Sequence, residues 1–599
     1  MRKVRTRLYR YLLPAVLSLG LAACGGSGGG GSNGLATGTA SPPAAPGSAP
    51  QPTTPLLPEP ATATPQEAAR FLSQATFGPT AGAIETVVDS SLEHWFMQQL
   101  AAPPSLHLEG VLARFPPDGR FLDERGNLLP GLVYTASDSF WRTAIEADDQ
   151  LRQRMAYTLS QILVIAAQGD LSRAPQTVAA YMDILTEGAF GNFRDLIDKV
   201  TYSPAMAVYL TYLRNEKADE LTGRVPDENY ARELMQLFTI GLVELDPDGE
   251  PVTGADGQAV ELFNNTDITN LARVFTGLSF SGAGFNTPLL RLPPEVFHQP
   301  LQMFNAYHSM EEKAFLGSAI PADTGGRDSI DRALDIIFQH PNVGPFLARQ
   351  LIQRFVTSDP APEYIRRVTD AFNTGLYSLP SGTQVGAGNR GDLTATLAAT
   401  LFDPQARAAE SVTDPKFGKL REPVIRFTHW ARAFEVNSAD AGNERLLRDT
   451  SSPESLGQHP YRSPSVFNFY RPGYVAPGTE TGAAQLTAPE LQITNATSIM
   501  GYTNFLTIYA LGRSPKVDSS LAPAFVADYA DELELSADPP ALLDHLDLLL
   551  THGTLQEETR NRITTAMDKI SPDSQAGLVA RVQLAIIMIM TSPEYIVLR

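Results

Sequence analysis

The chain has 599 residues, of which 46 are basic and 66 are acidic, so its net charge is −20 at pH 7. Such an acidic chain is not expected to bind nucleic acid or anionic lipid by bulk electrostatics. Its hydrophobic content of 43% is ample for a core, and its length exceeds the usual size of a single core, so we expect a lobed globule.

The first 23 residues have the features of a secretory signal. Basic residues from Arg2 to Arg10 precede an apolar run over residues 11–23 that is too short for a comfortable membrane span. Leu21-Ala22-Ala23-Cys24 matches the bacterial lipoprotein box, which implies cleavage before Cys24 and attachment of lipid, palmitate included, to its thiol. Cys24 is the only cysteine and has no internal disulfide partner. The alternative is an incidental cysteine after an ordinary signal.

Residues 24–65 are predicted to be a lipidated tether. They are rich in Gly and Ser, then in Pro, Ala and Thr, with almost no charge and no periodicity. Gly25 follows the cysteine where Asp would favour the inner membrane, so lipoprotein sorting implies a lipid anchor in the outer membrane, on its periplasmic or its cell-surface face. Loss of the signal removes five of the 46 basic residues and leaves a net charge of −25.

Helical periodicity dominates residues 66–599, which we expect to form a mainly α, multi-helix, two-lobed domain. The predicted helices span residues 66–74, 140–167 (one helix or a pair), 176–187, 193–200, 205–213, 226–241, 267–277, 328–338, 345–355, 363–373, 392–401, 422–434 and 575–590. The last is apolar almost all round, which predicts a buried helix.

Two irregular regions interrupt these helices. Residues 243–262 carry the turns Asp248-Gly249 and Asp256-Gly257 between β-prone pieces, which predicts a small hairpin excursion. The first turn weakly resembles a calcium loop, but it lacks the spacing of the later ligands. Residues 457–490 are rich in Pro, Gly and aromatic residues and predict a long irregular loop.

The helix at residues 226–241 carries polar groups beside an apolar stripe. Pro226 and Asp227 are start signals and Gly241 is a stop signal. Asn229 and Glu233 border the apolar face, whereas Glu228 and Arg232 point away from it and can pair at i and i+4.

Glu233 is therefore expected to be partly buried and to need a cation or hydrogen-bond donors. We expect this helix to pack against the one at 267–277, where Arg273 is the natural counter-charge. Two interpretations remain open: Glu233 acts as a catalytic acid or base with Arg232, Asn229, Arg273 and His308 nearby, or it only locks two helices together.

Several segments together resemble the bacterial domain-of-unknown-function family 1800. They are residues 68–79, 150–163, 188–198, 227–241, 271–277, 308–317, 464–474 and 488–490. The resemblance covers almost the whole chain after the tether and implies a large, mainly helical, exported protein. It also implies a partner, because members are often encoded beside an exported protein of family 1501. The family supplies no established catalytic residues to transfer. Leu278 and Ser309 depart from its common Trp and Asp.

No local motif defines a reaction or a cofactor. The nine histidines include no His-Glu-x-x-His pair, the chain has no cysteine pair, and no P-loop, dinucleotide fingerprint or nucleophile elbow occurs. His308 with Glu311 and Glu312 could join a site assembled from distant segments, or could simply cap a backbone carbonyl. A carboxylate pair acting on a glycan is also open, with Glu228 or Glu233 opposite Asp219 or Asp267.

Aromatic residues and an arginine mark the loop near residue 470. Tyr470, Arg471 and Tyr474 suit stacking on a sugar or docking a partner if they are exposed, and suit an irregular core crossing if they are buried.

Three functions stay open at this point. The first is a binding or assembly module of the cell envelope that acts with an exported partner. The second is a hydrolase or modifying enzyme for an extracellular polysaccharide. The third is an inert surface scaffold. An enzyme should bring Glu233, Arg273 and His308 into one cleft, whereas a binding module should expose an apolar surface.

Overall fold

The computed structural model describes residues 63–115, 134–437, 445–516 and 525–599, together with residues 132, 518 and 520. The signal, Cys24 and the tether up to residue 62 lie outside these residues. Within the described part the fold is mainly α-helical, with four antiparallel strand pairs of two or three residues per strand. None of the described helices is both long and apolar enough to cross a membrane.

The domain opens with a helix, as predicted, and this helix has a complete capping box. Helix α1 (Pro65–Ala75) begins at Thr64, whose hydroxyl accepts from the Glu67 backbone while the Glu67 carboxylate accepts from Thr64. The helices that follow up to residue 209 are α2 (Ala81–Asp89), α3 (Leu92–Ala101), α4 (Leu108–Leu112), α5 (Thr135–Glu146), α6 (Gln150–Ser160), α7 (Pro175–Gly188), α8 (Phe193–Thr201) and α9 (Pro204–Tyr209).

The predicted helix at 226–241 is split in two. Helix α10 (Asn229–Glu233) continues into a π-helical turn, η2 (Leu234–Thr239), where the Thr239 hydroxyl donates to the Leu234 carbonyl at 2.5 Å. Helix α11 (Asn265–Val274) packs against α10, and the rings of Tyr230 and Phe275 meet edge to face. The packing of these two helices was predicted, and it is confirmed.

The excursion between them is also confirmed. Isolated bridges Val243↔Glu261, Leu245↔Pro251 and Thr253↔Ala259 form a small ladder with two turns. The glycines of the two turns, Gly249 and Gly257, have φ of 76° and 78°, which Gly adopts without the steric cost of a Cβ.

The described residues from 278 onward contribute the remaining α-helices and the eight short strands. The helices are α12 (Gly326–Gln339), α13 (Val343–Phe355), α14 (Pro362–Thr374), α15 (Leu393–Phe402), α16 (Pro404–Arg407), α17 (Glu410–Thr413), α18 (Pro423–Ala433), α19 (Glu480–Ala483), α20 (Ala496–Ala510), α21 (Ala530–Leu535), α22 (Pro539–Thr551), α23 (Glu557–Met567), α24 (Gln575–Met590) and α25 (Pro593–Ile596). The strand pairs are β1 (Leu278–Ser279) with β2 (Gln302–Met303), β3 (Lys313–Phe315) with β4 (Ser318–Ile320), β5 (Tyr377–Ser378) with β6 (Gln384–Val385), and β7 (Lys419–Leu420) with β8 (Val597–Leu598).

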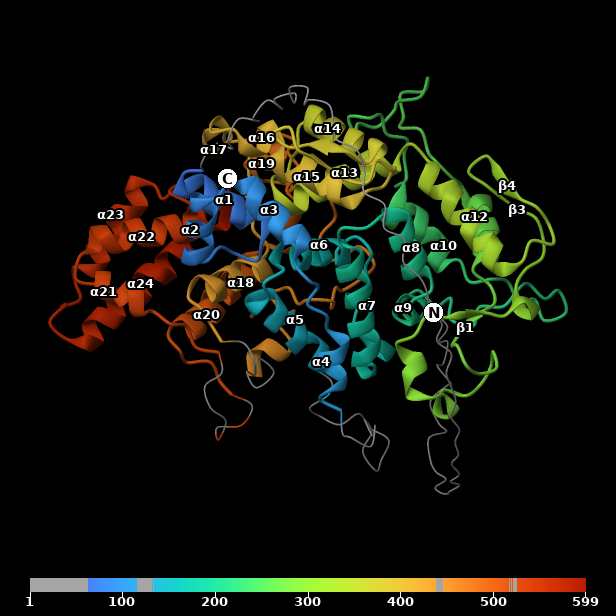
Figure 1. The fold of residues 1–599 in the computed structure, drawn as a ribbon, viewed down its shortest axis with the longest axis horizontal. Helices are drawn as coiled ribbons and strands as arrows, with labels where there is room; N and C mark the ends of the chain where they lie inside the picture. The colour runs from blue at the N-terminus through green and yellow to red at the C-terminus, as the bar shows by residue number, and fades with distance from the viewer. Residues whose placement is uncertain are drawn as a thin grey trace, which may run out of the picture.

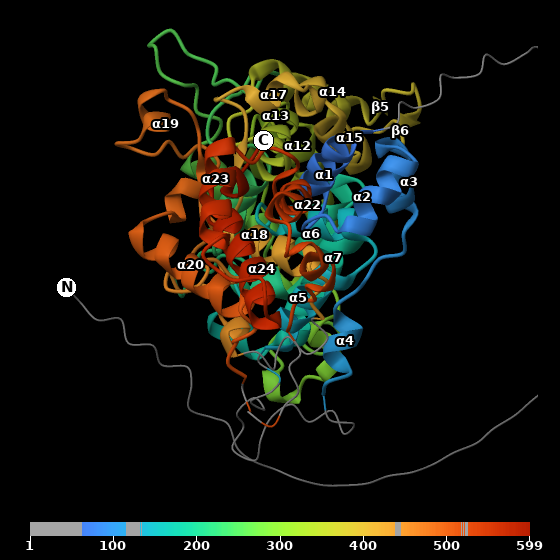
Figure 2. The same cartoon turned by 90° about the vertical axis from the view of Figure 1, so that its left-hand side faces the viewer.

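The two ends of the folded chain lie side by side. Helix α1 contacts α22, as both views show (Figure 1, Figure 2). The Arg70 Nε group donates to the Arg599 carbonyl at 2.9 Å, and β8 pairs with β7 at residues 419–420. Helices α21 to α24 occupy one end of the molecule and β3, β4 and α12 the other (Figure 1), yet the buried apolar side chains between them form one continuous cluster.

Arginines from other elements close the carboxyl ends of several helices. Arg432 donates to the Ile145 carbonyl at the end of α5, Arg154 to Arg354 at the end of α13, and Arg421 to Leu550 at the end of α22. Arg390 does the same for α12, through the Phe338 and His340 carbonyls. The last carbonyls of a helix have no hydrogen-bond partner within the helix and carry partial negative charge. The arginines supply both a hydrogen-bond donor and a positive charge at these carbonyls.

Candidate functional site

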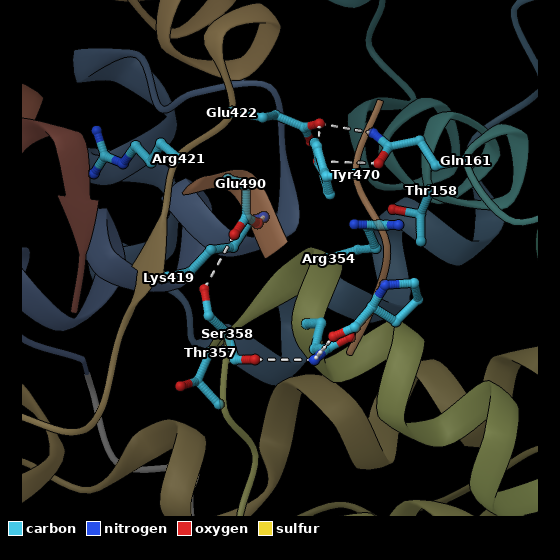
Figure 3. A network of polar contacts seen from close by, with 12 residues as sticks. Thr158, Gln161, Arg354, Thr357, Ser358, Lys419, Arg421, Glu422, Tyr470 and Glu490 are labelled. Atoms are coloured by element: carbon cyan, nitrogen blue, oxygen red, sulfur yellow. Dashed lines mark hydrogen bonds and ion pairs between the residues drawn. The ribbon is translucent and has the colours of Figure 1, made fainter. Parts of the chain in front are cut away.

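A buried polar network lies where α6, α13, α18 and the 457–490 loop meet (Figure 3). Its centre is Glu422, the residue just before α18, which is 0% exposed. One carboxylate oxygen of Glu422 accepts from four side chains: Gln458 Nε2 at 2.7 Å, Gln161 Nε2 at 2.9 Å, Tyr470 Oη at 2.5 Å and, more weakly, Tyr157 Oη at 3.5 Å.

A second carboxylate beside it is held by an ion pair. Lys419 Nζ lies 2.6 Å from Glu490 Oε1, and both side chains are almost completely buried. The Ser358 hydroxyl donates to the other oxygen of Glu490 at 3.2 Å. Both partners of this pair are thus hydrogen-bonded, which is the condition for burying charge without a large penalty.

Two buried guanidinium groups complete the network. Arg154 bonds Thr158 on its own helix and the Arg354 carbonyl, while the Arg354 guanidinium stacks on the Tyr470 ring at 4.7 Å. Burial alone would raise the pKa of the Glu422 carboxyl, but the charges of Lys419, Arg154 and Arg354 together hold it below its ordinary value. Glu422 is therefore ionised near neutral pH and has no proton to donate as a general acid.

The burial of the network suits a role in positioning the packed segments better than a role in catalysis. Its two carboxylates are both buried to 1% exposure or less, so a polymeric substrate has no access to them. It joins three of the segments that carry the family resemblance: Arg154 and Gln161 from 150–163, Tyr470 from 464–474 and Glu490 from 488–490. We infer that it fixes how these segments pack.

Asn229 and Arg232 lie on the surface side of α10. The Asn229 amide donates to the Thr211 hydroxyl at 2.7 Å, and Arg232 pairs with Glu228 at 3.5 Å, the i and i+4 contact predicted from the sequence. Asn229 is exposed and Arg232 is partly exposed.

Glu233 is half-buried, but the expected pairing with Arg273 is wrong. Arg273 instead pairs with Glu311 at 3.2 Å and bonds Asn270. Among the described residues, no cation lies within ion-pair distance of Glu233, and its Oε2 atom is buried without a hydrogen-bond partner. Burial raises the pKa of Glu233, and Arg232 offsets this only in part. The reason for the error is that the competing partner of Arg273, Glu311, comes from a loop distant in the sequence, which the helix angles of the two segments do not reveal.

His308 is a satisfied core histidine. Its Nδ1–H donates to the Thr276 carbonyl at 2.9 Å, so Nε2 is the acceptor that faces the Ser329 hydroxyl at 3.2 Å. Burial lowers the pKa of His308 to about 4, so the ring is neutral at physiological pH. This is the carbonyl-capping role that the sequence left open, and the ring is 0% exposed.

The aromatic loop is only partly a surface feature. Tyr470 is 1% exposed and belongs to the buried network, which corrects its role as an exposed binding residue. Its hydroxyl donates a hydrogen bond to Glu422, and no local pattern in the loop could predict this contact. Arg471 is exposed and lies over the Phe467 ring at 4.2 Å, and Tyr474 is half-buried.

Lys419, Glu422, Arg354 and Gln458 were not anticipated from the sequence. The one sequence feature that marks these residues is a charged or amide side chain inside an otherwise apolar stretch, such as Arg354 near the end of the apolar helix α13. That pattern marks burial with partners, but the partners come from distant segments and could not be paired beforehand. Gln161 and Glu422, for example, are 261 residues apart.

A serine–histidine contact elsewhere does not form a nucleophilic pair. Ser137 Oγ lies 3.1 Å from His459 Nε2, beside a narrow pocket under α7. However, His459 Nδ1 accepts the Thr450 backbone N–H at 3.2 Å, so the neutral ring carries its proton on Nε2 and donates to Ser137. Burial lowers the pKa of His459 to about 3, and a ring in this tautomer cannot take the serine proton.

Glu233 and Arg273 are thus not paired, and both ring nitrogens of the buried His308 have hydrogen-bond partners. Within the described ranges, no group of three His, Cys, Asp or Glu side chains is placed to hold a metal ion.

Comparison with known proteins places the chain in a family without assigning it a reaction. No curated protein matches it, and no solved structure matches it. One family model, described as a protein of unknown function (DUF1800), matches residues 70–597, nearly all of the chain after the tether. The family expected from the sequence segments is therefore the right one, and the chain belongs to the DUF1800 family.

Proposed function

We propose that the chain is a cell-envelope lipoprotein that is anchored in the outer membrane through Cys24 and binds an exported protein partner. The lipoprotein box at residues 21–24 and the 41-residue segment after Cys24, residues 25–65, support the anchor. The observation that carries the binding role is an exposed apolar hairpin at residues 219–225, which we call the Leu221 hairpin.

The Leu221 hairpin holds two aliphatic side chains in water. Leu221 is 98% exposed and Val225 is 76% exposed. The turn is nonetheless ordered: Asp219 and Arg224 exchange both backbone hydrogen bonds, at 3.0 and 3.1 Å, and Arg224 pairs with Glu216 at 2.6 Å. Exposing two aliphatic side chains on one fixed turn costs free energy in the isolated protein, and a partner would recover it.

The surroundings suit a protein interface. The Lys217 backbone N–H donates to the Tyr307 carbonyl at 2.9 Å, which ties the hairpin to the segment that carries Met310, 37% exposed. The partly exposed ion pairs Arg232–Glu228 and Arg273–Glu311 involve residues close in sequence to the hairpin and to Met310. An apolar centre with a charged rim is the usual composition of a protein–protein interface.

The partner we propose is the exported family-1501 protein, because the family resemblance implies that the two are encoded together. The test is to purify the mature lipoprotein with this partner and measure retention by affinity capture. A Leu221→Ser/Val225→Ser double variant should lose the partner. A matched control, Ile499→Ser/Met500→Ser, removes two aliphatic side chains of 53% and 60% exposure on α20 and should retain it. Equal retention by both variants would overturn the proposal.

A further inference from the structure

A second surface feature lies at the start of the folded domain, away from the Leu221 hairpin. A groove of about 460 Å³ runs between the start of α1, helix α2 and the pair α21–α22. Its walls include Ile84, Val88, Leu548 and Leu549, and its rim includes Glu85, Asp89 and Asp531. The volume is within the range of small-ligand and side-chain pockets, roughly 300–1,000 Å³.

The floor of the groove is apolar and fixed. Ile84 and Leu549 are almost completely buried, at 4% and 3% exposure, and belong to the continuous core, while Val88 and Leu548 pack against it from above. The groove is therefore lined by well-packed helices, and an aliphatic chain could lie along it without rearranging the core.

The acidic rim violates the local rules for a stable helix. Glu85 and Asp89 are four residues apart on α2, where like charges repel across one turn. Asp89 is also the last residue of α2, where the helix dipole disfavours a negative charge. Local stability does not explain these carboxylates, and such conflicts are typical of functional surfaces.

The three rim carboxylates have no partner of their own. Glu85, Asp89 and Asp531 are exposed, and none of them has an ion pair or side-chain hydrogen bond within the described residues. The fourth polar group of the lining, His545, is already engaged by Glu532 at 2.8 Å. Negative charge at the rim is thus available to a ligand.

We propose that this groove binds a peptide segment of another protein that carries Lys or Arg among aliphatic residues. Long basic side chains lay their methylene stems on apolar surface and place the charge at its edge, which matches an aliphatic floor with an acidic rim. The chain's own tether does not fit: residues 25–62 contain no Lys or Arg, and their only charged residue is Glu59, which has the same sign as the rim.

Binding is measured by fluorescence anisotropy with a labelled peptide of alternating Lys and Leu and the full mature lipoprotein in detergent. The Glu85→Gln/Asp89→Asn/Asp531→Asn variant should bind about tenfold more weakly, since each exposed ion pair contributes modestly. The control variant Glu109→Gln/Glu363→Gln/Asp568→Asn removes three exposed carboxylates elsewhere and should bind as the parent does. Equal weakening in both variants would show only attraction to the overall negative charge and would overturn the proposal.

Two further readouts locate the site. A Lys/Ser peptide of equal charge should bind more weakly than the Lys/Leu peptide, because it cannot use the apolar floor. Carbodiimide coupling followed by mass spectrometry should join peptide lysines to Glu85, Asp89 or Asp531. Equal binding of the two peptides, or coupling spread over other carboxylates, would also overturn the proposal. Neither readout involves the Leu221 hairpin, so this proposal and the proposed function can fail separately.

Discussion

Glu422 and Glu233 are two buried or half-buried carboxylates whose surroundings shift their pKa in opposite directions. Glu422 is fully buried yet ionised, because it receives three strong donors and lies among the charges of Arg154, Arg354 and Lys419. Glu233 is half-buried, has no cation at ion-pair distance in the described residues, and has a raised pKa. The first is stabilised by its surroundings and the second is destabilised by them.

Replacing Tyr470 by Phe should weaken the buried network. The change removes the 2.5 Å hydrogen bond to Glu422 but leaves the ring under the Arg354 guanidinium. A hydrogen bond to a charged group contributes about 1.5–3 kcal/mol, so the free energy of unfolding should fall by about 2 kcal/mol in urea denaturation. Tyr474→Phe is the control, because Tyr474 is half-buried and its hydroxyl has no such partner among the described residues, and it should change stability by less than about 0.5 kcal/mol. Equal losses would show that Tyr470 acts through packing alone.

Replacing Glu233 by Gln should keep or raise the melting temperature at pH 8. Because burial raises the pKa of Glu233 in the folded state, that state holds the proton more tightly, and stability falls as pH rises from the unfolded pKa through the folded one. Gln mimics the protonated form, so the gain should be present at pH 8 and absent at about pH 3, which is below the ordinary Glu pKa and where both states are mostly protonated. Because Glu233 is partly exposed to solvent, the gain in melting temperature should be small. A melting temperature several degrees lower would indicate an ion pair that the structure does not contain.

At the scale of the elements, arginine contacts with helix ends recur through the fold. Arg432 makes two contacts with backbone carbonyls: its Nε donates to Gly78 at 2.7 Å and its Nη1 to Ile145, at the end of α5, at 2.6 Å. The Arg432 guanidinium keeps its charge near neutral pH, although burial lowers its pKa to about 10. Such contacts let an acidic chain bury cations without pairing each one with a carboxylate.

Arg432→Lys should therefore destabilise the protein although it keeps the charge. An ammonium group cannot reproduce the planar fork that reaches two carbonyls, so we expect a loss of about 1–3 kcal/mol in thermal or urea unfolding. Arg471→Lys makes the same change on the surface, over Phe467, and should be nearly neutral. A neutral result at position 432 would contradict the capping role.

The helices were predictable from the sequence where periodicity and caps agree. Helices α7, α8, α12, α14 and α24 match the predicted spans within two residues at each end, because each carries its own start and stop signals. The segment at 226–241 was predicted as one helix, but it contains a π-helical turn that residue spacing does not reveal.

The buried network could not be predicted because its contacts are non-local. Tyr470 and Glu422 are 48 residues apart and Lys419 and Glu490 are 71 apart, and only the packing of α6, α13 and α18 brings them together. The wrong pairing of Glu233 with Arg273 has the same origin. Helix angles place each side chain on a face, but the competing partner Glu311 comes from a loop.

At the scale of the whole molecule, the chain joins a predicted lipid anchor to a helical domain whose two ends meet. Helix α1 begins at Pro65 beside α22, and the acidic groove lies at the same place. The Leu221 hairpin follows α9 and precedes α10, which lie away from α1 and α22 (Figure 1).

Cys24→Ser should release the protein from the outer-membrane fraction or leave its signal uncleaved. The lipid chains on Cys24 would hold the protein in the membrane because each buried methylene contributes about 0.8 kcal/mol. Serine cannot form the thioether that carries the lipid. Membrane fractionation with mass measurement of the amino terminus checks both outcomes. A correctly processed Cys24→Ser variant that still sediments with the outer membrane would contradict the anchor.

The most direct test of the proposed function is photo-crosslinking in cells from position 221. A photoreactive amino acid in place of Leu221 should give one dominant adduct that contains the exported family-1501 partner, because that side chain is 98% exposed at the proposed interface. The same amino acid in place of Met500, which is 60% exposed on α20, should not give that adduct. The absence of an adduct at position 221, or the same adduct from both positions, would contradict the account.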